Sequence, residues 1–442
     1  MISVQNHQQQ LSGNKSRVFF IIFLTTLLLS SCGLFSHGKK TNEPVVVKKD
    51  THEQTTEEKK EEKTDEKKDE TTHEVELKKK DSYNISYLLP FSIDEAELNQ
   101  LLSEEKISGY QPLGAVEFYE GALMALDTLK KYGVNLNISV YDNKKDSLST
   151  ALLLNSPGMK NTDLVIGPVF NESLKAGAAF AKQNNIYMIS PLSPSTNITF
   201  ENEYYLMANS TLHTQLEKTI EFVIKTHPNA NFIIVYRTEK ENETKIAAEF
   251  KSGFDELKTT NPLMTLKETY SFAGISANLN ATNNYVFIAS NEELFVNSLL
   301  RDLSKSSREN NITLLALQSI LSFESISLDY FENLHLHYPT AYYVNQDLSK
   351  VKQFNTTFTS LYDIKPADYA YRGYDITLYF GNLLKNYGPA ISSNFEKGNL
   401  MAPVMLGTFN FQPCKSGDTI KFYENQNITI LKYENYKFEK AN

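Results

Sequence analysis

The sequence predicts an α/β protein built from two parallel sheets, each covered by helices on both faces. From about residue 83 onward, short apolar runs alternate with longer amphipathic runs, as strands and helices do in doubly wound folds. The alternation is interrupted by a polar stretch at residues 196–203 and then restarts, which indicates two such units. A chain of 442 residues, 41% of them hydrophobic, is long enough to bury a core in each unit.

The first unit begins with a strand and alternates from there. Strands are expected at residues 83–89, 136–141, 164–166 and 186–189, because these runs are short and apolar. Helices are expected at residues 113–132, 147–154 and 174–182, and Gly133 closes the first of them. Strands that are separated by helices pair in parallel, so both faces of this sheet should be buried.

The second unit repeats the pattern. Helices are expected at residues 212–225, 244–258 and 294–304, and strands at residues 232–236, 266–270, 285–288 and 312–316. Phe354, Phe358 and Tyr362 are four residues apart, which places them on one helical face; we interpret them as a core stripe.

The N-terminus has the pattern of an export signal. Lys15 and Arg17 precede an apolar run at residues 18–29, which is too short to span a bilayer as a helix. The sequence at residues 29–32, Leu-Ser-Ser-Cys, resembles the lipobox of bacterial lipoproteins. This resemblance implies that residues 1–31 are a signal peptide, that Cys32 is lipidated, and that the protein is anchored facing the periplasm, in the outer membrane. A cleaved secretory signal with a chance cysteine, or an uncleaved membrane helix, are the alternatives.

Residues 32–82 are predicted to be a lipidated N-terminus followed by a disordered, charged linker. Residues 39–80 hold 12 Lys and 13 acidic residues and almost no large apolar side chain, so they cannot offset the entropy lost on ordering. Binding of the linker lysines to anionic lipid is an alternative, which the acids oppose. The whole chain has a net charge of −9, which argues against nucleic acid as a partner.

Four stretches within residues 83–442 resemble the type I periplasmic binding proteins, the solute receptors of which branched-chain amino acid receptors are familiar members. The stretches are residues 118–127, residues 163–168 with 186–191, residues 354–375 and residues 407–433. The resemblance implies two Rossmann-like lobes joined by a three-strand hinge, with the ligand held between them. Lobe one is then residues 83–208 plus 345–390, and lobe two is residues 209–344 plus 391–442.

In lobe one, the resemblance places the ligand at the loops that follow two neighbouring strands. The candidate ligand-binding residues there are Phe170, Asn171, Ser173, Leu192 and Ser193. Hydroxyl and amide side chains beside helix N-termini suit a carboxylate. Alternatively, Asn171 and Ser173 only cap the following helix. Phe170 and Leu192 add apolar bulk that would narrow the site.

In lobe two, the family supplies an aromatic wall and an acid for a ligand amino group. The matching loops here nominate Tyr236, Glu239 and Glu293. For each acid, a solvated surface position is the simpler interpretation.

Other chemistry finds little support. No Gly-rich phosphate loop, nucleophile elbow or His-Glu-x-x-His sequence is present, so we expect no enzyme, no cofactor and no metal. His335 and His337 would share a face of a strand but have no third ligand nearby in sequence. Cys414 has no identifiable base partner, so a buried or incidental thiol is expected.

The leading hypothesis is a lipid-anchored solute-binding protein that closes on a small polar or amino-acid-like ligand, with an ABC permease as a candidate partner. The alternative is an outer-membrane lipoprotein that regulates a peptidoglycan synthase, because the same fold and a long tether resemble such activators. A module whose cleft is filled by its own side chains is a third hypothesis.

Overall fold

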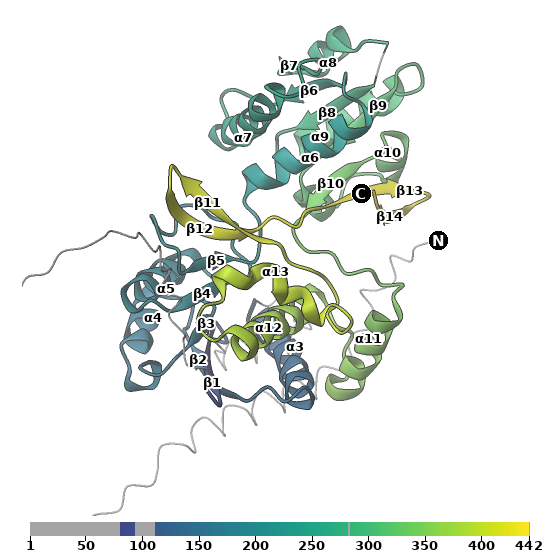
Figure 1. Cartoon of the computed structure of the whole chain (residues 1–442). Coiled ribbons are helices and arrows are strands. Elements are labelled where there is room, and N and C mark those ends of the chain that lie inside the picture. The colour runs from purple at the N-terminus through teal and green to yellow at the C-terminus, as the bar shows by residue number, and fades with distance from the viewer. Residues whose placement is uncertain (1–79, 93–110, 282, 442) are drawn as a thin grey trace, which may run out of the picture. The chain divides into compact units, whose positions relative to one another are not determined.

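The computed structural model describes residues 80–92, 111–281 and 283–441. This part of the chain forms two seven-stranded sheets with their helices (Figure 1). The predicted fold class, two doubly wound α/β lobes, is confirmed. Cys32, the predicted signal peptide and nearly all of the predicted linker lie outside the described residues. Within the described part, no helix is both long enough and apolar enough to cross a membrane.

The sheet of lobe one has the strand order β11-β12-β5-β4-β3-β1-β2. Its strands are β1 (Tyr83–Leu89), β2 (Leu136–Asp142), β3 (Leu164–Ile166), β4 (Tyr187–Ser190), β5 (Tyr205–Met207), β11 (Phe411–Ser416) and β12 (Thr419–Asn425). The first five pair in parallel, β12 joins β5 in parallel, and β11 closes the edge antiparallel to β12.

Helices bury both faces of this sheet. The helices of this lobe are α3 (Gln111–Lys131), α4 (Ser147–Leu154), α5 (Asn171–Asn184), α11 (Ser349–Tyr362), α12 (Asp368–Tyr387) and α13 (Phe395–Gly398), with short 3-10 turns η2 (Pro157–Met159), η4 (Ser392–Asn394) and η5 (Asn399–Met401). Of these, α11 packs against α12 through Phe354. Leu88 of β1 faces the cluster formed by α4 and α5. Tyr87 points the other way, and its hydroxyl lies 2.7 Å from Thr377 Oγ1 on α12. The alternation of side chains along a strand produces this division.

Two glycines bring α3 and α12 into backbone contact. A Cβ on Gly121 would lie 2.0 Å from the carbonyl oxygen of Ala370, and one on Gly373 would lie 1.9 Å from that of Phe118. Gly121 therefore faces α12.

The sheet of lobe two has the strand order β14-β13-β10-β9-β8-β6-β7. Its strands are β6 (Asn231–Val235), β7 (Thr265–Thr269), β8 (Asn284–Ile288), β9 (Ile312–Leu315), β10 (His337–Thr340), β13 (Thr429–Glu434) and β14 (Lys437–Lys440). Its helices are α6 (Leu212–Thr226), α7 (Glu241–Lys258), α8 (Phe272–Asn278), α9 (Glu293–Ser306) and α10 (Leu328–Asn333), with the 3-10 turn η3 (Gln318–Ser322). The parallel strands run from β7 to β10, and β13 and β14 are antiparallel.

Alternate residues of β6 divide the core of lobe two. Ile233 and Val235 pack with α8, α9 and α10, whereas Phe232 and Ile234 pack with α6 and α7. A strand that is apolar on both faces reads as a continuous apolar run, which is why the sequence predicts β6 so closely.

Most predicted elements are confirmed within a few residues. Phe354 and Phe358 stack within the core, as the helical spacing predicts. The strand β5 and the helix α8 have no counterpart among the predictions. His335 differs from expectation, because it adopts a left-handed φ of 47° in the turn before β10 and so does not share a strand with His337.

The predicted boundary at residue 391 is wrong for part of the tail. The hairpin of β11 and β12 was expected in lobe two, but it joins the sheet of lobe one through β5. The preceding residues also belong there, since Tyr379 of α12 donates a 2.5 Å hydrogen bond to the carbonyl oxygen of Phe395. A hairpin looks the same in sequence whichever sheet edge it joins, so the pattern could not locate it.

Three chain crossings connect the lobes, and one buried amide joins them. Asn425 Nδ2 donates to the carbonyl oxygens of Ala208, at 3.2 Å, and Ala341, at 2.9 Å. These carbonyls follow β5 and β10, and Asn425 itself ends β12. Asn425 Oδ1 accepts from the backbone N–H groups of Asn410 and Asn427, at 2.9 and 3.1 Å. One side chain therefore links all three crossings.

A buried carboxylate ties the second crossing to the segment that precedes β11. Asp375 of α12 accepts hydrogen bonds from the Tyr342 hydroxyl (2.7 Å) and from the backbone N–H groups of Leu406 (2.8 Å) and Gly407 (2.6 Å). Burial raises the pKa of Asp375 from 3.8 to about 6, although its three donors act in the opposite direction. The three donors thus stabilise the ionised form of Asp375, whereas its apolar surroundings destabilise that form.

We expect Asp375 to make stability depend on pH. Its folded pKa lies above its unfolded pKa, so its contribution is fully present below about pH 4 and is lost as pH rises through about 6. The shift corresponds to about 1.4 kcal/mol for each unit of pKa. Urea unfolding of the wild type and of Asp375→Asn, compared across this range, should therefore show the wild type losing stability relative to the variant as pH rises. An unchanged difference between the two proteins would contradict this account, and Asp347→Asn, at a side chain that is 97% exposed, is the control.

Candidate functional site

The loops after β3 and β4 meet at the carboxyl edge of the lobe-one sheet. Ser193 Oγ donates a 2.8 Å hydrogen bond to Asn171 Oδ1, and Ser193 Oγ in turn accepts from the backbone N–H of Ser195 at 3.2 Å. Ser193 is buried, whereas Asn171 is exposed. The structure thus brings two of the sequence-predicted residues into direct contact.

The helix α5 begins in this loop pair, and no side chain caps it. Phe170 is its N-cap residue and makes no side-chain cap hydrogen bond. Asn171 and Ser173 lie inside the helix, so the capping role considered for them does not apply. Ser173 is 0% exposed, and its hydroxyl has no hydrogen-bond partner among the described residues. A helix N-terminus of this kind favours a negatively charged group.

The two apolar candidates of lobe one are half-buried. Phe170 has the Lys145 ammonium 5.5 Å from its ring centroid. The backbone carbonyl of Leu192 accepts a 2.9 Å hydrogen bond from Asn209 Nδ2, which fixes the loop after β4 against the first crossing. Phe170 and Leu192 directly precede Asn171 and Ser193 in the sequence, so both flank this hydrogen-bonded pair.

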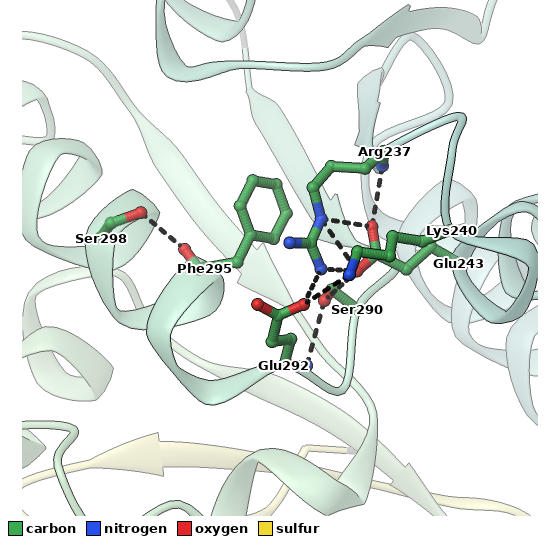
Figure 2. A network of polar contacts seen from close by, with 7 residues as sticks. All are labelled: Arg237, Lys240, Glu243, Ser290, Glu292, Phe295 and Ser298. Carbon is green, nitrogen blue, oxygen red and sulfur yellow. Dashed lines mark hydrogen bonds and ion pairs between the residues drawn. The ribbon is translucent and has the colours of Figure 1, made fainter.

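Lobe two carries an ion-pair network at the corresponding edge of its sheet (Figure 2). Arg237 follows β6, Glu243 lies in the first turn of α7, and Glu292 is the N-cap residue of α9. The Arg237 guanidinium binds Glu243 and also lies 2.5 Å from Glu292 Oε2. We refer to Arg237, Lys240, Glu243, Ser290 and Glu292 as the arginine network.

Glu243 is held from several directions. Its oxygens accept from the Arg237 backbone N–H at 2.8 Å, from Arg237 Nε at 3.1 and 3.2 Å, and from Ser290 Oγ at 2.6 Å. Burial would raise the pKa of Glu243, but hydrogen bonds from Arg237 and Ser290 outweigh it and hold that pKa below its ordinary value. The carboxylate is consequently ionised and paired.

The outer part of the arginine network orders the start of α9. Ser290 Oγ accepts a 3.1 Å hydrogen bond from the Glu292 backbone N–H, and Lys240 Nζ lies 3.7 Å from Glu292 Oε2. The Arg237 guanidinium carbon lies 4.3 Å from the centroid of the Phe295 ring, a cation–π geometry. The loops after β6 and β8 are thereby fixed to each other.

The sequence-predicted residues of lobe two lie outside this network. The hydroxyl of Tyr236 donates to Glu268 Oε2 at 2.7 Å, and its ring contacts Tyr270. Glu239 is exposed. Glu293 accepts from the Ser325 backbone N–H at 2.5 Å, and hydrogen bonds from the side chain and the backbone of Ser325 lower the pKa of its carboxyl. The structure does not bring these three side chains together.

The sequence nominated the two loops of lobe two that follow β6 and β8, but it did not nominate Arg237, Glu243, Ser290 or Glu292. An arginine directly after a buried strand, followed by an acid in the first turn of the next helix, is the signal that was available. This pattern alone does not predict the network, because Glu292 comes from another loop. Its proximity to Arg237 depends on the order of the strands in the sheet.

The remaining candidates for reactive chemistry have ordinary structural surroundings. Cys414 Sγ donates to Glu424 Oε1 at 3.2 Å, and burial raises the pKa of its thiol, which disfavours the nucleophilic thiolate. His337 Nδ1 lies 2.7 Å from the His335 carbonyl oxygen, and burial lowers its pKa. The described residues contain no group of three or more His, Cys, Asp or Glu that could hold a metal ion.

Comparison with known proteins identifies the fold. No protein-family model matches the sequence, and no curated protein matches it. Among solved structures, a protein assigned to a branched-chain amino acid ABC transporter of Rhodospirillum rubrum aligns with a TM-score of 0.58 and 14% identity, covering 81% of this chain and 100% of that one. An ABC-type branched-chain amino acid transporter protein of Rhodopseudomonas palustris aligns with a TM-score of 0.54 and 11% identity, covering 81% and 95%.

A third similar structure is an ABC transporter substrate-binding protein of Desulfitobacterium hafniense, with a TM-score of 0.52, 16% identity and coverage of 81% of this chain and 100% of that one. At these identities the likeness concerns the fold. The chain has the type I periplasmic binding protein fold, and the similar structures are described as transport and substrate-binding proteins.

We expect Arg237→Met to destabilise lobe two strongly. The Glu243 side chain is only 5% exposed, so removal of the guanidinium leaves a buried charge without its main partner. Breaking one half of a buried ion pair costs about 3–5 kcal/mol. Chemical denaturation would measure the loss. Arg301→Met removes an exposed pair with Asp302 and should cost under about 1 kcal/mol; equal effects of the two substitutions would show that burial of Glu243 does not matter.

Proposed function

We propose that this chain is a lipid-anchored solute-binding protein that faces the periplasm, closes on a small polar or amino-acid-like ligand and serves an ABC importer. The fold is the first support, since the similar structures are ABC transporter proteins. The lipobox-like sequence at Cys32 supports the anchor, and the charged stretch that follows supports a tether. The similar structures do not favour the cell-wall synthase regulator considered as an alternative.

The observation that carries the proposal is the carboxyl edge of lobe one. It combines the N-terminus of α5, which lacks a side-chain cap, with the buried and unpartnered hydroxyl of Ser173 and the paired side chains of Asn171 and Ser193. A buried hydroxyl without a partner is unfavourable unless a ligand or water satisfies it. A ligand carboxylate would satisfy this hydroxyl and the free N–H groups of the first helical turn together.

Closure follows from differential affinity. A ligand that contacts both lobes only in the shut form shifts an equilibrium between conformations that the hinge already permits. In the proposed function, Phe170 and Leu192 shape the apolar side of the lobe-one site. Tyr236, Glu239 and Glu293 remain candidates for the lobe-two side.

Ligand binding should raise the melting temperature of the purified full chain. Binding to the native state alone stabilises by about 2.7 kcal/mol at one hundred times the dissociation constant. A thermal-shift screen of amino acids and small carboxylates measures this effect. Absence of any shift across a broad library, with a native-like circular dichroism spectrum, would reject the proposal.

Ser193→Ala should weaken the binding of whichever carboxylate the screen identifies. The substitution removes the donor to Asn171 and a hydroxyl at the site, and loss of a hydrogen bond to a charged group is worth about 1.5–3 kcal/mol. Isothermal titration calorimetry provides the measurement. Ser252→Ala, on the exposed surface of α7, is the matched control and should bind like the wild type.

Lipidation is tested at Cys32. When cells are fed a labelled fatty acid, the wild-type chain should incorporate the label and sediment with membranes, whereas Cys32→Ser should do neither. Cys414→Ser is the control and should be labelled as the wild type is. Labelling of the Cys32→Ser chain would show that the lipid is attached elsewhere, and unlabelled wild type would reject the anchor.

A further inference from the structure

The proposed solute-binding function leaves the ligand class open, and the arginine network narrows it. We infer that the ligand is a carboxylate that lacks an ammonium group and presents an oxygen acceptor to Arg237 of lobe two. This inference rests on the proposed function. α-Keto acids, hydroxy acids and dicarboxylates have this chemistry, whereas α-amino acids do not.

The acids that could receive a ligand ammonium are already occupied. Both oxygens of Glu243 accept from Arg237, and one also accepts from Ser290. Glu292 pairs with Arg237 and Lys240, and Glu293 accepts from the backbone of Ser325. An ammonium placed here would compete with a guanidinium that is covalently part of the site. The Arg237 guanidinium therefore occupies the position beside these acids that a ligand ammonium group would otherwise take.

The two other acids of these loops offer little to a ligand. Glu241 pairs with Lys245 at 2.7 Å, and its side chain is 82% exposed. Glu239 is also exposed. Ion pairs at such positions are worth only about 0–1 kcal/mol because water screens them. Neither acid provides the desolvated site that selective recognition of an ammonium requires.

Arg237 has donors left over after its ion pairs are made. A guanidinium carries five N–H donors. Those of Nε and Nη2 point toward Glu243 and Glu292, whereas Nη1 has no hydrogen-bond partner among the described residues. In Figure 2, one terminal nitrogen of the Arg237 side chain carries no dashed line. An oxygen acceptor is the group that complements two remaining N–H donors.

The position of Arg237 is fixed before any ligand arrives. Its side chain is 17% exposed, Phe295 covers one face of the guanidinium, and Glu243 holds it from α7. A guanidinium that is already ordered loses little rotamer entropy on binding, so its free edge can select ligands by geometry. The two cations of the arginine network, Arg237 and Lys240, are balanced by two acids, so Arg237 acts as an oriented donor more than as an attracting charge.

Matched pairs of compounds test the inference on the purified full chain. The probes are α-ketoisocaproate against leucine and α-ketoglutarate against glutamate, with affinities measured by calorimetry after a thermal-shift screen. In each pair the two compounds share the carboxylate and the side chain and differ at the oxo or ammonium group. We expect the keto acid of at least one pair to bind at least about tenfold more tightly than its amino acid, as one charge-assisted hydrogen bond predicts.

Two variants and one control separate the role of Arg237 from that of Glu292. Arg237→Lys keeps a cation beside Glu243 but removes the planar fork, so it should weaken keto acid binding about tenfold or more. Arg301→Lys, on the exposed face of α9, should bind like the wild type. Glu292→Gln removes a half-exposed partner of Arg237 and should strengthen keto acid binding severalfold, because the guanidinium is then less neutralised.

The outcomes distinguish failure of the inference from failure of the proposed function. Amino acids that bind as tightly as their keto counterparts, or that bind less tightly to Glu292→Gln, would overturn the inference and leave solute binding intact. Keto acid binding that Arg237→Lys does not weaken would also overturn it. Failure of every solute to bind the wild type would overturn both.

Discussion

The amide of Asn425 is the contact on which the relation between the two lobes depends. It donates to one carbonyl after β5 and to one after β10, and it stands at the end of β12. A buried carbonyl without a partner is costly, and no other side chain of this length supplies both two donors and an acceptor. In the proposed receptor, a motion of the lobes that keeps these hydrogen bonds would pivot about this amide. Asp375 adds a second buried tie, which joins the second crossing at Tyr342 to the segment that precedes β11.

The elements between the crossings were largely predictable, because each one is encoded locally. The strand β3 and the helix α4 occur where the apolar pattern predicts them. The strand β5 was missed because its three residues follow a polar stretch and carry little periodicity. The hairpin of β11 and β12 was assigned to the wrong lobe for a different reason: its partner strand ends more than 200 residues earlier, and no local feature encodes that pairing.

The candidate site was predictable in position but not in its contacts. Parallel strands bring their carboxyl ends to one edge, so the loops that contain Asn171 and Ser193 could be nominated from the alternation together with the family resemblance. The contact between these two side chains follows from adjacent strands, β3 and β4. The pairing of Arg237 with Glu292 depends in addition on the placement of β8 next to β6 and on the direction in which a long side chain reaches. Neither of these features is visible in the spacing of residues.

The hinge and the arginine network together suggest how closure would gain its energy in the proposed receptor. Arg237 attracts a ligand weakly while water surrounds it, because the charges of Arg237 and Lys240 are balanced by Glu243 and Glu292. Its free N–H groups contribute more once the lobes exclude water, since a hydrogen bond is stronger in a medium of lower dielectric constant. The contact is therefore worth more in the shut form than in the open one. This difference is the quantity that drives a hinge equilibrium, and it requires an arginine whose position is fixed in advance.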